Sequence, residues 1–155
     1  MDRSPAPRHY LAQLNVGRMQ APLDSLVMEP FMSRLDEING LADGSPGFVW
    51  RLKSDSGNAT DIRVDDDPTL LFNLSLWDSI QSLRDFVYRS RHLDLLRRRR
   101  EFFVPLGEEH LVLWWVPSGH FPSLQEARQR LGDLRARGAT QDAFTLRAPF
   151  AAPNA

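Results

Sequence analysis

His92 is the first residue in this sequence that could carry acid–base chemistry. A free imidazole has a pKa of about 6.5, so it can accept or donate a proton at neutral pH. The apolar spacing after Asp78 predicts a helix that runs towards residue 92, and the C-terminal end of a helix also stabilises a cationic imidazolium. Two roles therefore stay open for His92, a catalytic acid or base and a structural charge at the end of a helix.

Polar side chains lie on the mixed faces of two predicted strands. Residues 9–16 and 69–77 alternate in hydrophobicity, which is typical of strands with one apolar face. Side chains at every second position share a face, so Asn15 belongs to the mixed face of the first strand. The mixed face of the second strand carries Asn73, Ser75 and Trp77. These groups could orient the carbonyl or phenol of a small molecule, or simply hydrogen-bond one another.

Four further residues are candidates for contacts with a ligand. Trp50 and Arg51 lie on a short predicted strand, where the guanidinium could pair with a carboxylate of the protein or of a ligand. Trp114 lies on the strand predicted after residue 109. His120 comes just before a predicted helix whose free N–H groups favour an anion, although the surrounding "VPSGHFPS" also reads as a shaped turn.

Composition excludes several classes of function. The chain has no cysteine, which removes disulfides, thiolate catalysis and cysteine-ligated metals. Its four histidines are scattered without a ligand spacing, so we expect no dedicated metal site. A formal net charge of -1 gives no global attraction to nucleic acid or to an anionic membrane. The arginines at 97–100 would spread around a helix, which favours a solvated surface over a nucleic-acid interface.

The 155 residues fit a single domain. We place it at residues 9–150, with flexible termini at 1–8 and 151–155. The first ten residues hold no apolar signal segment, and no stretch approaches the roughly 18 apolar residues that a membrane span requires. We therefore expect a cytoplasmic protein that does not enter the membrane.

The predicted elements follow the order β, α, β, β, α, β, with a helix and an edge strand appended. The strands and helices fall near 9–16, 25–41, 48–52, 69–77, 78–92 and 110–116, followed by a helix from Ser123 to Gly138 and a strand at 143–150. Two helices that cross between strands of one antiparallel sheet give the α+β, ferredoxin-like arrangement. In that arrangement the crossover helices cover only one face of the sheet.

The strand "HLVLWWVPSGH", residues 110–120, raises the question of what covers the second face. Neighbouring side chains on a strand point to opposite faces, so Trp114 and Trp115 cannot share one core. Each buried indole removes about 150 to 250 Å² from water, which makes an uncovered face costly. A second copy of the chain could cover it, giving a two-fold homodimer. The alternative is that the appended C-terminal segment does so.

The segment "LSLWDSIQSLRDFVYRSRH", residues 74–92, resembles the strand–turn–helix of the dimeric α/β-barrel superfamily, which includes the antibiotic-biosynthesis monooxygenases. More closely, "SPGFVWRL", "FVYRSRH" and "LWWVPSGHFPSLQEARQRL" are similar to a bacterial family of unknown function within that superfamily, over residues 9–150. The resemblance implies a ferredoxin-like protomer, a homodimer and a small-molecule pocket between the sheet and its helices.

The resemblance and the placement of His92 together lead to a functional hypothesis. We expect a small-molecule-binding protein, and the reaction we expect is a cofactor-independent oxidation, isomerisation or cyclisation of an aromatic or polyketide-like substrate. In that hypothesis His92 is the acid or base. Two alternatives stay open: a haem-binding protein, and a non-catalytic structural or ligand-sensing dimer.

The haem alternative can be compared with this sequence residue by residue. Haem-degrading relatives carry an Asn on the first strand, a Trp on the helix after the third strand and an iron-ligating His further along that helix. Asn15 matches the first of these positions, whereas Phe86 and Leu96 stand at the other two. His92 could bind iron only from a different place.

We therefore expect the protein to bind no haem. Titration with haemin should leave the Soret band of free haemin unchanged, because the expected ligand position holds an aliphatic side chain. A saturable Soret shift at one equivalent of haemin would contradict this prediction. A His92→Ala variant would then show whether His92 is the ligand.

Overall fold

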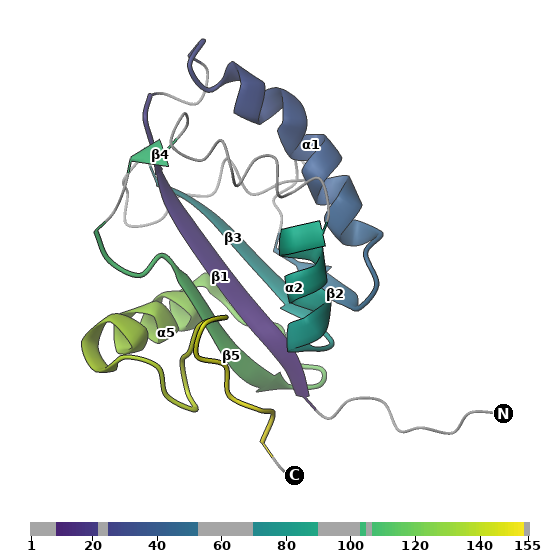
Figure 1. Cartoon of the computed structure of the whole chain (residues 1–155), viewed down its shortest axis with the longest axis vertical. Helices are drawn as coiled ribbons and strands as arrows, with labels where there is room; N and C mark the ends of the chain where they lie inside the picture. The colour runs from purple at the N-terminus through teal and green to yellow at the C-terminus, as the bar shows by residue number, and fades with distance from the viewer. Residues whose placement is uncertain (1–8, 22–24, 53–69, 90–102, 105–106, 154–155) are drawn as a thin grey trace, which may run out of the picture.

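The computed structural model describes residues 9–21, 25–52, 70–89, 103–104 and 107–153. The sheet contains β1 (His9–Met19), β2 (Phe48–Arg51), β3 (Leu70–Trp77), β4 (Phe103–Val104) and β5 (Leu111–Pro117). The helices are α1 (Glu29–Asp43), α2 (Ile80–Arg89) and α5 (Leu124–Arg137). Figure 1 shows α1 and α2 on one side of the sheet and α5 on the other.

The order of the strands confirms the predicted ferredoxin-like arrangement. β2, β3 and β1 are neighbours, and both β5 and the short β4 pair with the far edge of β1. Every pairing is antiparallel. β1 pairs with both β3 and β5, so it lies between these two strands. The helices α1 and α2 connect strands that are not neighbours, as the sequence order predicted.

The local signals read from the sequence explain where two helices begin and end. Pro30 occupies the first turn of α1, where its missing N–H costs no hydrogen bond. The Ser123 hydroxyl accepts the Glu126 backbone N–H at 3.1 Å at the start of α5. Gly138 ends α5 with a positive φ of 75°.

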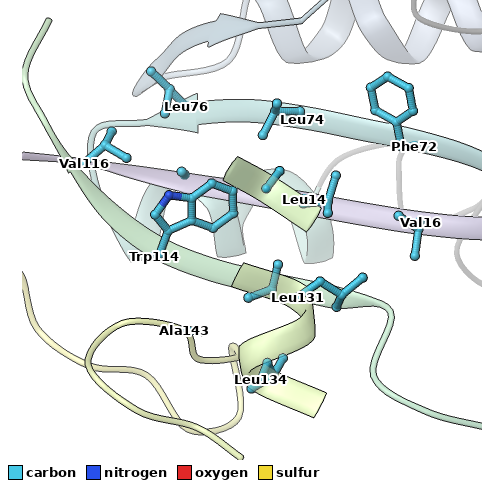
Figure 2. Close-up of a cluster of buried hydrophobic side chains, with 13 residues drawn as sticks. Leu14, Val16, Phe72, Leu74, Leu76, Trp114, Val116, Leu131, Leu134 and Ala143 are labelled. Carbon is cyan, nitrogen blue, oxygen red and sulfur yellow. The ribbon is translucent and has the colours of Figure 1, made fainter. Parts of the chain in front are cut away.

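One face of the sheet, which we call the α5 face, is wholly apolar and is covered by the appended helix. β1, β3 and β5 contribute Ala12, Leu14, Val16, Phe72, Leu74, Leu76, Val112, Trp114 and Val116. Ala127, Leu131 and Leu134 of α5 pack on them, as Figure 2 shows for the two leucines. All these side chains are buried within a single chain. The premise of the predicted homodimer, that the crossover helices leave a face for a second copy, is therefore wrong.

The opposite face, which we call the α2 face, is covered by the two crossover helices and by the C-terminal segment. Its core contains Leu11, Ala42, Trp77, Leu83, Phe86, Leu113 and Phe144. The crossover helices lie on the mixed face of β3, with Leu83 and Phe86 of α2 beside Trp77. The more apolar face of the sheet is covered by α5. This helix directly follows β5 in the chain and folds back across β5 and β1.

Residues 138–153 pass from α5 to the α2 face. Phe144 exchanges two backbone hydrogen bonds with Leu113, both of 2.8 Å. The edge strand predicted at 143–150 is reduced to two isolated bridges, Phe144 with Leu113 and Ala143 with Thr140. The Trp115 indole donates to the Phe150 carbonyl at 2.8 Å, and the Arg84 guanidinium donates to the Leu146 carbonyl at 2.6 Å. The second indole of β5 is thus covered by the chain's own tail.

Several expectations lie outside the described residues. They concern the polar loop at 53–68, His92, the arginines at 97–100 and the terminus at 1–8. Within the described ranges, none of the helices is long and apolar enough to cross a membrane.

The tail predicts a stability difference between two phenylalanines. Phe144 is 0% exposed and packs on Phe150, whereas Phe121 is 57% exposed. Phe144→Ala should lower the free energy of unfolding by about 3 to 5 kcal/mol, because it leaves a cavity in a closed core. Phe121→Ala is the matched control and should cost less than about 1 kcal/mol. Urea denaturation measures both, and equal losses would show that the tail does not close this core.

Candidate functional site

A row of polar side chains crosses three strands on the α2 face. Arg51 of β2 is the cross-strand partner of Ser75 of β3, and Ser75 is the partner of Gln13 of β1. We call these three residues the polar row. Adjacent strands are about 4.8 Å apart, so the row spans roughly 10 Å of backbone. The next cross-strand pair on the same face is Asn15 and Asn73.

Gln13 is the centre of a hydrogen-bond network within this row. Its side-chain nitrogen donates to the Asn73 Oδ1 at 2.8 Å and to the Ser75 Oγ at 2.9 Å. The Trp77 indole donates to the same Ser75 Oγ at 2.9 Å. Gln13 and Ser75 are both buried. The Ser75 oxygen therefore accepts two bonds, and no described residue accepts its hydroxyl proton.

Aromatic rings border the network on the side of α2. The Trp77 ring lies 5.3 Å from the Phe86 ring at an interplanar angle of 30°. Phe48 of β2 meets Trp77 edge to face, with ring centroids 5.4 Å apart. The polar groups thus lie beside an apolar, aromatic wall, which is the usual composition of a small-molecule site.

Asn15 is the exception in this cluster. Its Oδ1 is buried and has no hydrogen-bond partner among the described residues. A buried amide without a partner costs about 1 to 3 kcal/mol, and native proteins satisfy almost all such groups. The Asn15 Oδ1 is therefore the one buried side-chain atom of the cluster whose hydrogen-bonding capacity the described residues leave unused.

Arg51 extends the row to the edge of the sheet. Its Nε donates to the Asp43 Oδ1 at 2.9 Å, and a second nitrogen reaches the Asp43 Oδ2 at 3.4 Å. The sequence allowed Arg51 to pair with a carboxylate of the protein or of a ligand, and the structure shows a pair with a carboxylate of the protein. A hollow of about 380 Å³ lies here, lined by Asp43 and by residues 48–52.

Three predicted site residues, Trp50, Trp114 and His120, lie apart from the polar row and its hydrogen-bond network. Trp114 lies on the α5 face and donates its indole N–H to the Glu126 Oε2 at 2.9 Å. The His120 Nε2 lies 2.7 Å from the other oxygen of the same carboxylate. Trp50 meets the Phe121 ring edge to face, with centroids 5.4 Å apart. Glu126 thus connects β5, the following loop and α5, which explains Trp114 and His120 as structural contacts.

The structure brings together five of the residues proposed from the sequence: Asn15, Arg51, Asn73, Ser75 and Trp77. It adds Gln13 as the hub and Asp43 as the partner of Arg51. Gln13 lies on the same strand face as Asn15, which was a signal for including it. Nothing local to Asp43 marks it, since the pairing depends on how α1 meets β2.

The described part of this site can bind and orient a molecule, but it holds no acid or base of ordinary strength near neutral pH. Amide, hydroxyl and indole groups donate or accept hydrogen bonds without changing charge. The described residues also hold no group of three His, Cys, Asp or Glu side chains that could bind a metal ion. Proton transfer would therefore need a residue such as His92, which lies outside the described ranges.

Comparison with known proteins identifies the family of the chain. Residues 10–155 match the model of DUF3291, a domain of unknown function. The chain belongs to the DUF3291 family. This finding confirms the resemblance read from the sequence to a family of unknown function. No curated protein matches the chain.

Solved structures similar to this DUF3291 chain share little sequence with it. PA3566 from Pseudomonas aeruginosa is 11% identical over 75% of this chain and 100% of its own, with a TM-score of 0.50. SnoaB, a cofactor-independent oxygenase from Streptomyces nogalater, is 15% identical over 74% and 96%, with a TM-score of 0.46. NE2512 from Nitrosomonas europaea, of unknown function, is 10% identical over 76% and 98%, with a TM-score of 0.47. At these identities such likeness concerns the fold alone.

The hydrogen-bond network predicts that Ser75 stabilises the fold. In Ser75→Ala the indole N–H of Trp77 and the amide of Gln13 lose their shared acceptor in a buried place. We expect the free energy of unfolding to fall by about 1 to 3 kcal/mol. The exposed Ser118, replaced by alanine, is the control and should change it by less than about 0.5 kcal/mol. Urea denaturation measures both values. If Ser75→Ala has the same free energy of unfolding as the wild type, the network does not contribute to stability.

Proposed function

We propose that this DUF3291 protein binds a small, largely apolar molecule on the α2 face, with an oxygen or nitrogen of that molecule at Asn15 and Ser75. The observation that carries the proposal is the Asn15 Oδ1, which is buried and has no hydrogen-bond partner among the described residues. A second support is the unused hydroxyl proton of Ser75 on the same face. A ligand that hydrogen-bonds to both Asn15 and Ser75 would supply the partners that the described protein does not provide.

The aromatic wall defines the body of the ligand. Phe48 is partly exposed beside the buried rings of Trp77 and Phe86, and its ring favours planar apolar groups, which pack on rings edge to face or offset. An aromatic or polyketide-like molecule with a carbonyl or phenol group fits this surface. Asn15 and Ser75 would fix its orientation, because each hydrogen bond has a defined direction.

The reaction that we propose for such a ligand is a cofactor-independent oxidation, isomerisation or cyclisation. Amide and hydroxyl groups that orient an enol or phenol suit this chemistry, because they bind the oxygen without a metal. His92 is the residue that we propose as acid or base. If the chain forms a homodimer, the contact uses surfaces other than the α5 face, since α5 covers that face.

The rival proposal is a structural protein whose polar groups only pair with each other. Gln13, Ser75 and Trp77 do pair with each other, as that alternative expects. Asn15 separates the two proposals, because a purely structural role gives no reason to keep its amide without a partner.

Asn15→Leu tests the proposal directly. On ligand-free protein we expect the free energy of unfolding to rise by about 1 kcal/mol, because an unsatisfied buried amide is replaced by an apolar group of similar size. Native mass spectrometry of the wild type, purified under gentle conditions, should show a bound small molecule that Asn15→Leu lacks.

The exposed amide of Gln141 offers the matched control. Gln141→Leu should keep the bound molecule and should not become more stable. An Asn15→Leu protein that is destabilised and still carries the same ligand would contradict the proposal. A wild type that shows only its own mass would favour the structural alternative.

A further inference from the structure

The hollow of about 380 Å³ at the outer edge of β2 is separate from the Asn15 site. Its lining consists of Asp43 at the end of α1 and residues 48–52, which are β2 and the residue that follows it. β2 is an edge strand in the order of the described strands. Its size is within the range of small-ligand sites, about 300 to 1,000 Å³.

Arg51 places a guanidinium at this hollow, and only some of its N–H groups have a hydrogen-bond partner among the described residues. Its side chain is only 10% exposed, and a guanidinium carries five N–H groups. Two of them are directed at Asp43, which leaves three without a partner among the described residues. The Arg51 Nη1 has no partner among the described residues and is not one of the fully buried atoms, so this nitrogen keeps some contact with solvent.

Asp43 is a replaceable partner for that cation. It is the last residue of α1, where the helix dipole disfavours a negative charge, and the last turn of α1 has no basic residue to offset it. Its side chain is 44% exposed, and the second of its two contacts with Arg51 is long, at 3.4 Å. A carboxylate from solution could therefore take its place on Arg51, while Asp43 turns into water.

The walls of the hollow are apolar and partly aromatic. Phe48, Val49, Trp50 and Leu52 all contribute to its lining and are partly buried. Among the described residues of the lining, Arg51 carries the positive charge and Asp43 the negative one. A doubly charged phosphate would have only one guanidinium to offset its charge and would lie beside the Asp43 carboxylate. A ligand carboxylate carries a single charge, and its two oxygens match the planar edge of the guanidinium.

We propose that this hollow binds the carboxylate of a small aromatic acid through Arg51, with Asp43 as the group that the ligand displaces. The aromatic body rests against the apolar lining of the hollow. This site goes beyond the proposed function, because it uses none of the groups at Asn15 and is recognised by a different chemical group of a ligand.

The test uses 2-naphthoate and its uncharged analogue 2-naphthamide as probes of the full-length protein. Amide resonances of ¹⁵N-labelled protein follow the titrations. We expect 2-naphthoate to shift the signals of Val49, Trp50 and Leu52 in a saturable way, and 2-naphthamide to bind at least tenfold more weakly. Arg51→Gln should weaken 2-naphthoate at least tenfold, and Asp43→Asn should strengthen it about fivefold, because the competing carboxylate is gone.

Arg135 provides a matched control, since it pairs with Glu108 at 3.3 Å elsewhere in the molecule. Arg135→Gln should bind 2-naphthoate as the wild type does. Equal binding of the acid and the amide overturns the proposal, and so does an Asp43→Asn protein that binds 2-naphthoate no better than the wild type. Both comparisons hold even if Arg51→Gln fails to fold. Neither depends on Asn15, so this proposal and the proposed function can fail separately.

Discussion

The alternation of side chains along β1, β3 and β5 is the constraint on which the rest of this structure depends. Because successive residues point to opposite faces, apolar residues at nearly every position produce a sheet with two apolar faces. Both faces must be covered within a chain of 155 residues. The chain solves this with three layers: α5 on one face, the sheet, and α1, α2 and the tail on the other.

This division of the faces determines where chemistry can occur. The α5 face is apolar throughout and closely packed, and its polar contacts, from Trp114 and His120 to Glu126, connect the end of β5 to the start of α5. The α2 face contains the polar row and Asn15 among aromatic rings. Its network also fixes the register of the sheet, because a slip by one residue would turn Gln13 and Ser75 into the apolar face and leave them without partners.

Residues that are adjacent in sequence therefore have different roles. Trp50 faces the α5 side and contacts Phe121, whereas Arg51 is in the polar row and binds Asp43. Trp114 is part of the apolar core, while Trp115 bonds to the tail through Phe150. The sequence proposed Trp50, Arg51, Trp114 and His120 each as a ligand contact, and of these four only Arg51 lies in the polar row.

The amino-acid sequence by itself determined the elements and the faces of this protein. Periodicity and capping residues are local properties, so the strands, the start of α5 at Ser123 and the common face of Asn73, Ser75 and Trp77 could be predicted from neighbouring residues alone. Only the tertiary structure decided which element covers which face, and that the tail rather than a second copy closes over Trp115. It also decided that Arg51 pairs with Asp43 and that Asn15 is left without a partner. These outcomes depend on contacts between residues far apart in the chain, whose geometry is set by how whole elements pack and not by any local pattern.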